Sequence, residues 1–232
     1  MDEDPRAALL WLHDAGHRAR GARITEALAH RGVSLQALEL RYDAKRPDFL
    51  ADDVCKAARK LRARGCPCYV LGEGAGGIIG LLCALNQPAP IDGLICIGVC
   101  LEPEISPARR RILEVLAALA SRTARRSKAR SMVELMCAAK ELRKSIASVS
   151  TPLLVMHGAA DAVARPSGGE YLHRHAGSRD KTLLMYEGYH HDLLDGDGLE
   201  PVLDRITRWI DERVNAPSDR PQIGIEYINE LP

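Results

Sequence analysis

A glycine-rich segment at residues 72–77 has the spacing of a motif that presents a nucleophile. It reads Gly-Glu-Gly-Ala-Gly-Gly, follows an apolar run at 68–71, and precedes an apolar helix candidate that begins at Ile78. This layout is that of a nucleophile elbow, G-x-S-x-G, in which a sharp turn from strand to helix lifts a serine above the edge of a sheet. The apex position in this chain is Gly74, so the turn is predicted without the side chain that would attack.

The same glycines also fit a phosphate-binding loop. Gly72, Gly74 and Gly77 match the dinucleotide fingerprint G-x-G-x-x-G, and Asp92 lies near the position of the acid that binds the ribose in such domains. That loop normally follows the first strand of its domain, whereas this one follows two earlier strand candidates, 7–13 and 33–40. A lone match of this kind is weak, and the segments described next favour the elbow.

Two later segments carry residue types that an elbow would need as partners. Residues 150–161 read Ser-Thr-Pro-Leu-Leu-Val-Met-His-Gly-Ala-Ala-Asp, and residues 181–193 read Lys-Thr-Leu-Leu-Met-Tyr-Glu-Gly-Tyr-His-His-Asp-Leu. With the elbow, they resemble α/β-hydrolases of the monoacylglycerol lipase type, also called the serine aminopeptidase S33-like or lysophospholipase-like group. In that family a P-x-L-x-x-H-G-x-x-D segment supplies the acid of the catalytic triad, and a Y-x-G-x-x-H segment supplies the histidine. The resemblance implies Asp161 as the acid and His191 as the histidine, with His190 as the alternative.

The N-terminal segment extends this resemblance. Leu-His-Asp-Ala-Gly at residues 12–16 resembles the family's H-G-x-G oxyanion loop, and residues 71–77 resemble its L-G-H-S-M-G-G elbow. The resemblance therefore implies an oxyanion site at His13, Asp14 and Gly16, together with Ala75 after the apex. The order of elbow, acid and histidine along the chain is also the order that α/β-hydrolases require.

Three positions depart from the family pattern, and all three weaken catalysis. Gly74 replaces the nucleophile, Glu73 replaces the preceding histidine, and Asp14 replaces the first glycine of the oxyanion loop. An oxyanion needs preorganised hydrogen-bond donors, and a carboxylate beside it would repel the developing negative charge. The sequence therefore predicts a hydrolase site from which the attacking group is missing.

Other side chains are poor substitutes for the missing serine. Glu73 is one position from the apex, so its side chain is expected to point away from the cleft, and Cys68 lies too deep at the start of its strand. Cys100, at the end of the strand candidate 93–99, is the least implausible thiol, although a reactive thiol needs a neighbour that lowers its pKa. His191 and Asp161 could instead activate water.

Strand and helix candidates alternate along most of the chain. Strand candidates are 7–13, 33–40, 68–71, 93–99, 152–156 and 182–186, and helix candidates are 24–31, 49–64, 78–85 and 201–214. This alternation predicts an α/β fold with a mostly parallel central sheet and helices on both faces; the resemblance specifies the α/β-hydrolase fold. We expect a single domain over 1–232, with a small helical cap inserted at about 102–149, where helices are predicted at 109–119 and 132–146. The tail at 215–232 is interpreted as an added edge strand, a partner-binding strand or a disordered segment.

Composition narrows the class of function. The formal net charge is +1 and aromatic residues make up 4% of the chain, so a nucleic-acid partner is not expected. The seven cysteines lack metal-ligand spacing, and with no signal-peptide pattern they indicate reduced thiols in a cytoplasmic protein without metal or cofactor. The cap is basic, with an arginine-rich stretch at 121–130. That stretch is either a solvated helix face or a peripheral contact with anionic membrane or an acidic partner.

Two hypotheses for function follow. The first is a pseudohydrolase, a catalytically degenerate relative of monoacylglycerol lipases that binds a lipid-like ligand, an acyl ligand or a protein partner through the former active-site cleft. The second is a divergent hydrolase or esterase that acts on acyl esters with His191 and Asp161 and no serine nucleophile. The oligomeric state does not follow from the sequence.

Overall fold

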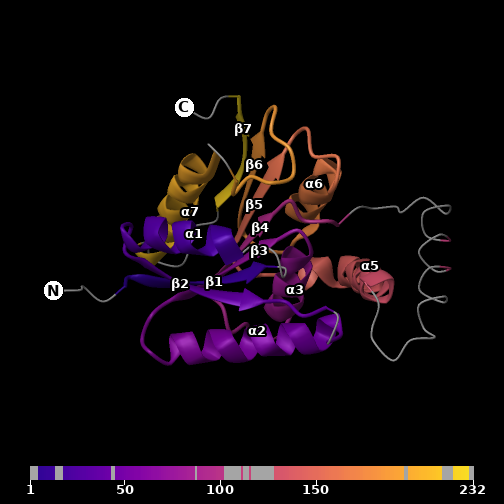
Figure 1. Cartoon of the computed structure of the whole chain (residues 1–232), viewed down its shortest axis with the longest axis horizontal. Helices are drawn as coiled ribbons and strands as arrows, with labels where there is room; N and C mark the ends of the chain where they lie inside the picture. The colour runs from indigo at the N-terminus through magenta and orange to yellow at the C-terminus, as the bar shows by residue number, and fades with distance from the viewer. Residues whose placement is uncertain are drawn as a thin grey trace.

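Seven strands form one sheet in which every neighbouring pair is parallel (Figure 1). The computed structural model describes residues 5–13, 18–42, 45–86, 88–101, 111, 115, 128–195, 198–215 and 222–229. The strands are β1 (Ala7–His13), β2 (Val33–Glu39), β3 (Cys68–Glu73), β4 (Gly93–Ile97), β5 (Leu153–Gly158), β6 (Asp180–Tyr186) and β7 (Gln222–Ile228). Their order across the sheet is β2-β1-β3-β4-β5-β6-β7.

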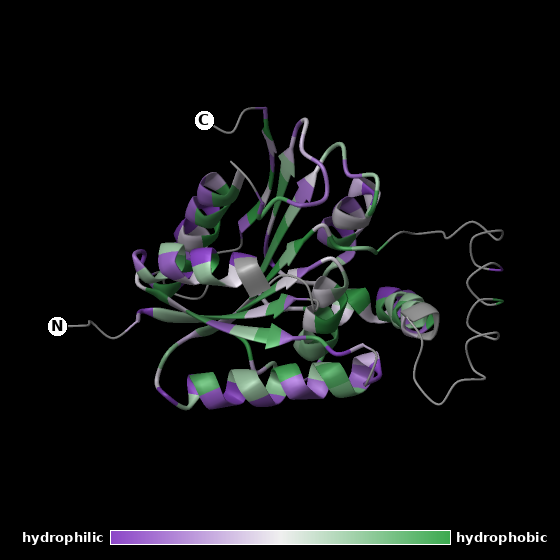
Figure 2. Cartoon of the chain, viewed as in Figure 1, coloured by the Kyte–Doolittle hydropathy of each residue, from purple (hydrophilic) through white to green (hydrophobic). Residues whose placement is uncertain are grey.

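Helices cover both faces of this sheet. They are α1 (Arg18–Ala29), α2 (Pro47–Arg62), α3 (Ala75–Ala84), α5 (Lys128–Ser145), α6 (Pro166–His175) and α7 (Leu199–Val214). One hydrophobic cluster joins the sheet to α2, α3, α5 and α6, and a second joins the opposite face to α1 and α7. The central strands are hydrophobic along their length, whereas α2 and α7 alternate between hydrophobic and hydrophilic residues (Figure 2).

Burial on both faces explains why the central strands are continuous apolar runs. All seven residues of β1 are buried. Because side chains alternate along a strand, Leu10 and Leu12 pack into the first cluster while Leu9 and Trp11 pack into the second. Strand β3 is buried in the same way from Cys68 to Gly72.

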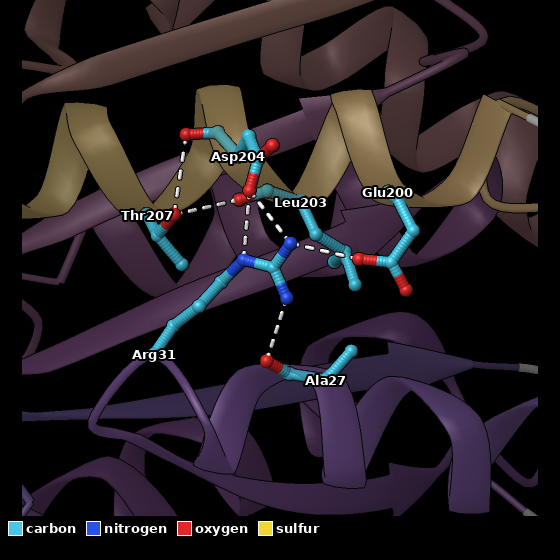
Figure 3. Close-up of polar contacts among 6 residues, drawn as sticks. All are labelled: Ala27, Arg31, Glu200, Leu203, Asp204 and Thr207. Atoms are coloured by element: carbon cyan, nitrogen blue, oxygen red, sulfur yellow. Dashed lines mark hydrogen bonds and ion pairs between the residues drawn. The ribbon is translucent and has the colours of Figure 1, made fainter.

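An arginine two residues after α1 connects the two helices of one face. Arg31 donates hydrogen bonds to Asp204 and Glu200 of α7 and to the carbonyl oxygen of Ala27 (Figure 3). The Arg31 side chain is 22% exposed and both of its acidic partners are 60% exposed, so solvent screens these ion pairs. The contact supplements the hydrophobic packing of α1 and α7 against the sheet.

The sequence predicted most of these elements but not all of them. Helix α5 covers the helix expected at 132–146, whereas the helix expected at 109–119 lies outside the described residues apart from Arg111 and Val115. The tail adds β7 to the sheet, which is one of the three interpretations left open for it. Helix α6 was not predicted; its Gly168 and Gly169 are poor helix formers and hide it.

The strand order reverses next to β1, since β2 lies on one side of it and β3 on the other. In open parallel sheets, ligands bind beyond the carboxyl ends of the strands at such a switch point. His13, Gly74, Gly98 and Asp161 all lie at or just after the carboxyl ends of strands. Within the described residues, no helix is long and apolar enough to cross a membrane.

Candidate active site

The turn between β3 and α3 has a backbone conformation that favours a glycine at its apex. Gly74 has φ 50° and ψ −111°, in a region that side chains rarely adopt. Its N–H donates to the carbonyl oxygen of Ile97 at 2.8 Å, which anchors the apex to the end of β4. The sequence therefore forms the sharp turn of an elbow without the strain that a side chain would add.

The flanking glycines of the turn allow close backbone approach. A Cβ on Gly72 would lie 2.5 Å from the carbonyl carbon and oxygen of Gly76, and one on Gly76 would lie 2.7 Å from the carbonyl oxygen of Leu12. Both distances are shorter than a Cβ tolerates. Tight packing of helix, strand and neighbouring strand thus accounts for these glycines.

His191 and Asp161 form a hydrogen-bonded pair beside this turn. His191 Nδ1 lies 2.8 Å from Asp161 Oδ2, and the Asp161 side chain is fully buried while that of His191 is 29% exposed. The other carboxylate oxygen, Oδ1, accepts hydrogen bonds from the backbone N–H groups of Val163 (2.8 Å) and Ala164 (2.9 Å). When His191 is neutral and donates from Nδ1, its Nε2 keeps a lone pair that can accept a proton.

The Nε2 atom of His191 faces the empty apex. A Cβ on Gly74 would lie 3.6 Å from Nε2 and 3.8 Å from Cε1 of His191. A hydroxyl on that carbon would come within hydrogen-bonding reach of Nε2, the arrangement of a nucleophile and its base. The geometry therefore holds a base and its orienting acid beside a position that has no nucleophile.

Gly98, the residue after β4, borders the His–Asp pair and was not predicted from the sequence. It has φ 55°, and a Cβ there would lie 3.1 Å from both Cε1 and Nδ1 of His191 and 3.5 Å from Asp161 Oδ2. A side chain at this position would push the imidazole away from Gly74. The only signal in the sequence is a glycine inside an apolar strand candidate.

His157 supports the loop that carries Asp161 and was also missed. It is fully buried; its Nε2 lies 2.8 Å from the carbonyl oxygen of Ala164 and 3.4 Å from Asp161 Oδ2. Burial lowers the pKa of His157, so the ring is neutral and donates from Nε2 to that carbonyl. This bond holds the loop from Asp161 to Ala164 closed around the carboxylate.

Hydrogen bonds keep Asp161 ionised despite its burial. Burial alone would raise the pKa of the carboxyl group. The hydrogen bonds from His191 and from the N–H groups of Ala164 and Val163 outweigh it, and the net pKa of Asp161 is lowered. A charged Asp161 favours the His191 tautomer that has its proton on Nδ1.

The structure shows which of the two adjacent histidines, His190 or His191, pairs with Asp161. His190 is exposed, and its Nδ1 bonds to the carbonyl oxygen of Ala160 at 3.0 Å. Only His191 of the two reaches both Asp161 and the apex at Gly74.

Three of the remaining candidate residues, His13, Glu73 and Ala75, lie at the turn or at the neighbouring end of β1. Glu73 accepts a hydrogen bond from Trp11 Nε1 at 2.6 Å and pairs with Arg20, and the ring of buried His13 lies 4.5 Å from the Trp11 ring. Ala75 is the first residue of α3. Asp14 and Gly16 lie outside the described residues.

The two candidate thiols differ in burial. Cys68 is fully buried, and burial raises its pKa to about 12, which makes it unreactive. Cys100 is exposed and lies two residues after Gly98. Among the described residues no group of three or more His, Cys, Asp or Glu side chains is placed to hold a metal ion.

Comparison with known proteins identifies relatives over most of the chain. The model of a family described as serine aminopeptidase, S33, matches residues 3–131 and 121–197. Caffeoylshikimate esterase from Arabidopsis thaliana is 33% identical over 105 residues, which are 44% of this chain and 32% of the esterase. Monoglyceride lipase from Rattus norvegicus is 25% identical over 188 residues, which are 66% of this chain and 61% of the lipase. The chain thus spans less than two thirds of either relative.

Solved structures of similar fold include two lipases. One is a soluble variant of monoglyceride lipase from Saccharomyces cerevisiae in complex with a substrate analogue, with a TM-score of 0.76 at 19% identity. The matched region covers 92% of this chain and 89% of the lipase chain. A monoacylglycerol lipase from Paleococcus ferrophilus has a TM-score of 0.73 at 16% identity, covering 89% of this chain and 94% of its own. At these identities the likeness concerns the fold, and it agrees with the predicted arrangement of a parallel sheet between helices.

Proposed function

The chain belongs to the serine aminopeptidase S33 family of α/β-hydrolases, and we propose that it is a catalytically degenerate member that binds a lipid-like ligand through the former active-site crevice. The single observation that carries this proposal is the glycine at the apex. A Cβ at that position would lie 3.6 Å from Nε2 of His191, the base that would activate a serine. A protein partner is the other occupant that the crevice could receive.

The chemistry of the site supports a ligand that carries a hydroxyl group next to an acyl chain. With the nucleophile absent, His191 Nε2 has a free lone pair at the place where a serine hydroxyl would donate. A ligand hydroxyl can donate to Nε2 instead, because Asp161 holds the imidazole proton on the opposite nitrogen. The monoglyceride lipases among the relatives support a monoacylglycerol-like ligand.

A non-hydrolysable monoacylglycerol analogue tests this proposal. We expect a 1-O-alkylglycerol ether to bind the wild type and to shift the NMR signals of the His191 ring, while the corresponding ester binds and stays intact. His191→Ala should weaken binding about 3- to 10-fold, since one hydrogen bond contributes about 0.5–1.5 kcal/mol. His190→Ala is the matched control and should leave affinity unchanged, because its ring bonds to Ala160. Absence of ether binding would contradict the proposal, and release of fatty acid from the ester would contradict the degeneracy.

The intact His–Asp pair favours one second candidate, a hydrolase that uses water directly. In that reaction His191 Nε2 takes a proton from water, and the hydroxide adds to the ester carbonyl. The tetrahedral intermediate then collapses, and the leaving alkoxide receives the proton from His191. The 2.8 Å bond to Asp161 would stabilise the imidazolium between these two steps. Ester hydrolysis by the wild type that His191→Ala abolishes would establish this candidate.

We further propose that the basic stretch 121–130 contacts anionic membrane at its cytoplasmic surface. The proposal rests on the sequence, because most of this stretch lies outside the described residues. Each basic side chain near such a surface contributes about 1 kcal/mol. Replacing Arg122, Arg125 and Arg126 by glutamine should therefore weaken binding to phosphatidylserine vesicles about 100-fold. Sedimentation with these vesicles should also show binding that falls steeply with salt, and binding indifferent to salt would contradict the contact.

A further inference from the structure

Two buried cysteines from different helices lie almost within bonding distance. Cys55 of α2 and Cys83 of α3 have their Sγ atoms 2.7 Å apart, closer than unbonded sulfur atoms normally come. Their exposed fractions are 1% and 0%. A disulfide bond is about 2.05 Å long, so a small shift of either side chain would permit one. The pair lies on the inner sides of α2 and α3, away from the His191–Asp161 pair.

Hydrogen-bond donors around the pair make the two thiols unequal. Cys55 Sγ also receives a hydrogen bond from Asn86 Nδ2 at 3.1 Å. The pKa of Cys55 is lowered to about 7, chiefly by its hydrogen bond with Cys83. The hydrogen bond from Asn86 and the charge of Arg59 add to this effect, and together they outweigh burial, which would raise the pKa. The pKa of Cys83 is raised, chiefly by its bond to Cys55. The Asn86 amide donates to the Cys55 sulfur, which favours a thiolate at Cys55 over one at Cys83 and assigns them the roles of attacking and resolving cysteine.

We propose that Cys55 and Cys83 form a redox-reactive thiol pair that hydrogen peroxide converts into a disulfide. The Cys55 thiolate attacks one peroxide oxygen, the O–O bond breaks, and the departing hydroxide takes up a proton to leave as water. This step forms a sulfenic acid on Cys55. The Cys83 sulfur then attacks the Cys55 sulfur, and the S–O bond breaks. The hydroxide that leaves combines with the Cys83 proton as a second water. In total, two thiols are oxidised to one disulfide, and one peroxide is reduced to two waters.

The proposal requires a small oxidant to reach Cys55 past the exposed side chains that cover it. Asn86, which donates to its sulfur, is exposed, as are Lys56 and Arg59 on the same helix as Cys55. The thiol thus lies one side chain beneath solvent. Cys68 and Cys96 differ, because burial raises the pKa of each, that of Cys68 to about 12, with no comparable set of donors. These two cysteines serve as internal references that should stay reduced.

Peroxide treatment followed by peptide mapping tests the pair. In a Cys66→Ser, Cys100→Ser, Cys137→Ser background, which removes the less buried thiols, we expect peroxide to cause the loss of two thiols per molecule. Mass spectrometry should show a peptide cross-linked between Cys55 and Cys83 that dithiothreitol separates. The two residues are 28 apart, and closing a loop of that size should raise the apparent Tm by about 5–10 °C.

Two variants separate the reaction from a structural effect. With Cys83→Ser, Cys55 should stop at the sulfenic acid and be trapped by dimedone, with no gain in Tm. With Cys55→Ser, Cys83 should not be labelled by dimedone at neutral pH. Failure of the background protein, with both cysteines intact, to form the cross-linked peptide would overturn the proposal. Equal oxidation of Cys68 or Cys96 would overturn it as well.

Discussion

We expect the Gly74→Ser variant to react covalently with a fluorophosphonate probe, whereas the wild-type protein does not. The serine Cβ would lie 3.6 Å from His191 Nε2, so its hydroxyl can donate to a base that Asp161 already orients. Removing the nucleophile from a serine protease lowers kcat by about 10⁶-fold. Restoring the serine should recover only part of this factor, because an incomplete oxyanion site still lowers the rate by about 10²–10³-fold. We therefore expect labelling of the variant to be about 10³-fold faster than any reaction of the wild type.

Gly74→Ala is the matched control for this prediction. Alanine and serine both place a Cβ at φ 50°, so each should lose about 1–3 kcal/mol of stability, but only serine should label. The double variant Gly74→Ser, His191→Ala should not label, because the hydroxyl loses its base. A folded Gly74→Ser protein that stays unreactive would contradict the assignment of Gly74 as the nucleophile position.

A second variant tests the oxyanion loop that the sequence predicts. Asp14 stands where the resemblance implies a glycine, and a carboxylate there would oppose the oxyanion. Adding Asp14→Gly to Gly74→Ser should therefore raise the rate of small-ester hydrolysis above that of either single variant. An equal rate in the double variant and in Gly74→Ser would show that Asp14 does not limit the reaction.

Gly158→Ala should destabilise the protein by about 3 kcal/mol or more. A Cβ at this position, the last residue of β5, would lie 2.2 Å from the carbonyl oxygen of His190 and 2.3 Å from that of Tyr189. These neighbours are backbone atoms, so the segment that carries His191 would have to move. Urea denaturation should give the loss of stability, and the same change in the Gly74→Ser protein should suppress its labelling.

Gly224→Ala provides the comparison for that measurement. Gly224 is also a strand residue, but nothing lies within 4 Å of a Cβ built on it and its φ is not positive. Its replacement should change stability by less than about 1 kcal/mol, and in the favourable direction, because alanine restricts the unfolded chain. A similar effect at both positions would show that the segment after β6 adapts to a side chain at residue 158.

The sequence predicted the sheet well because its central strands are buried on both faces. The strands predicted at 7–13 and 68–71 are β1 and β3, and the predicted and observed bounds differ by no more than two residues. Helix α2 was also predicted, since its apolar residues repeat along one side and Gly65 follows its end. The elbow turn could be predicted because its glycines are needed for close backbone packing at Gly72 and Gly76 and for the positive φ of Gly74.

The contacts between distant segments could not be predicted in the same way. Nothing in residues 93–99 indicates that Gly98 will lie against an imidazole from the end of β6. The choice between His190 and His191 depends on the direction of the backbone after Gly188, which has φ 75°. Helix α6 is hard to predict because Gly169 weakens the helical pattern. The glycine is needed there because a Cβ at residue 169 would lie 2.8 Å from Nδ1 of His157.

The strand order also determines how the protein can be assembled during synthesis. Strands β1 to β4 come from residues 7–97, and they can pair with one another while β5 to β7 are still being made. Until β5 joins β4, the nascent sheet ends in a buried strand with unpaired backbone groups, which is a site for association with other chains. Asp161 and His191 follow that junction, whereas Gly74 precedes it. A ribosome-bound chain that stops before β5 should therefore depend on a chaperone, and the site at Gly74 becomes complete only in the last stage of folding.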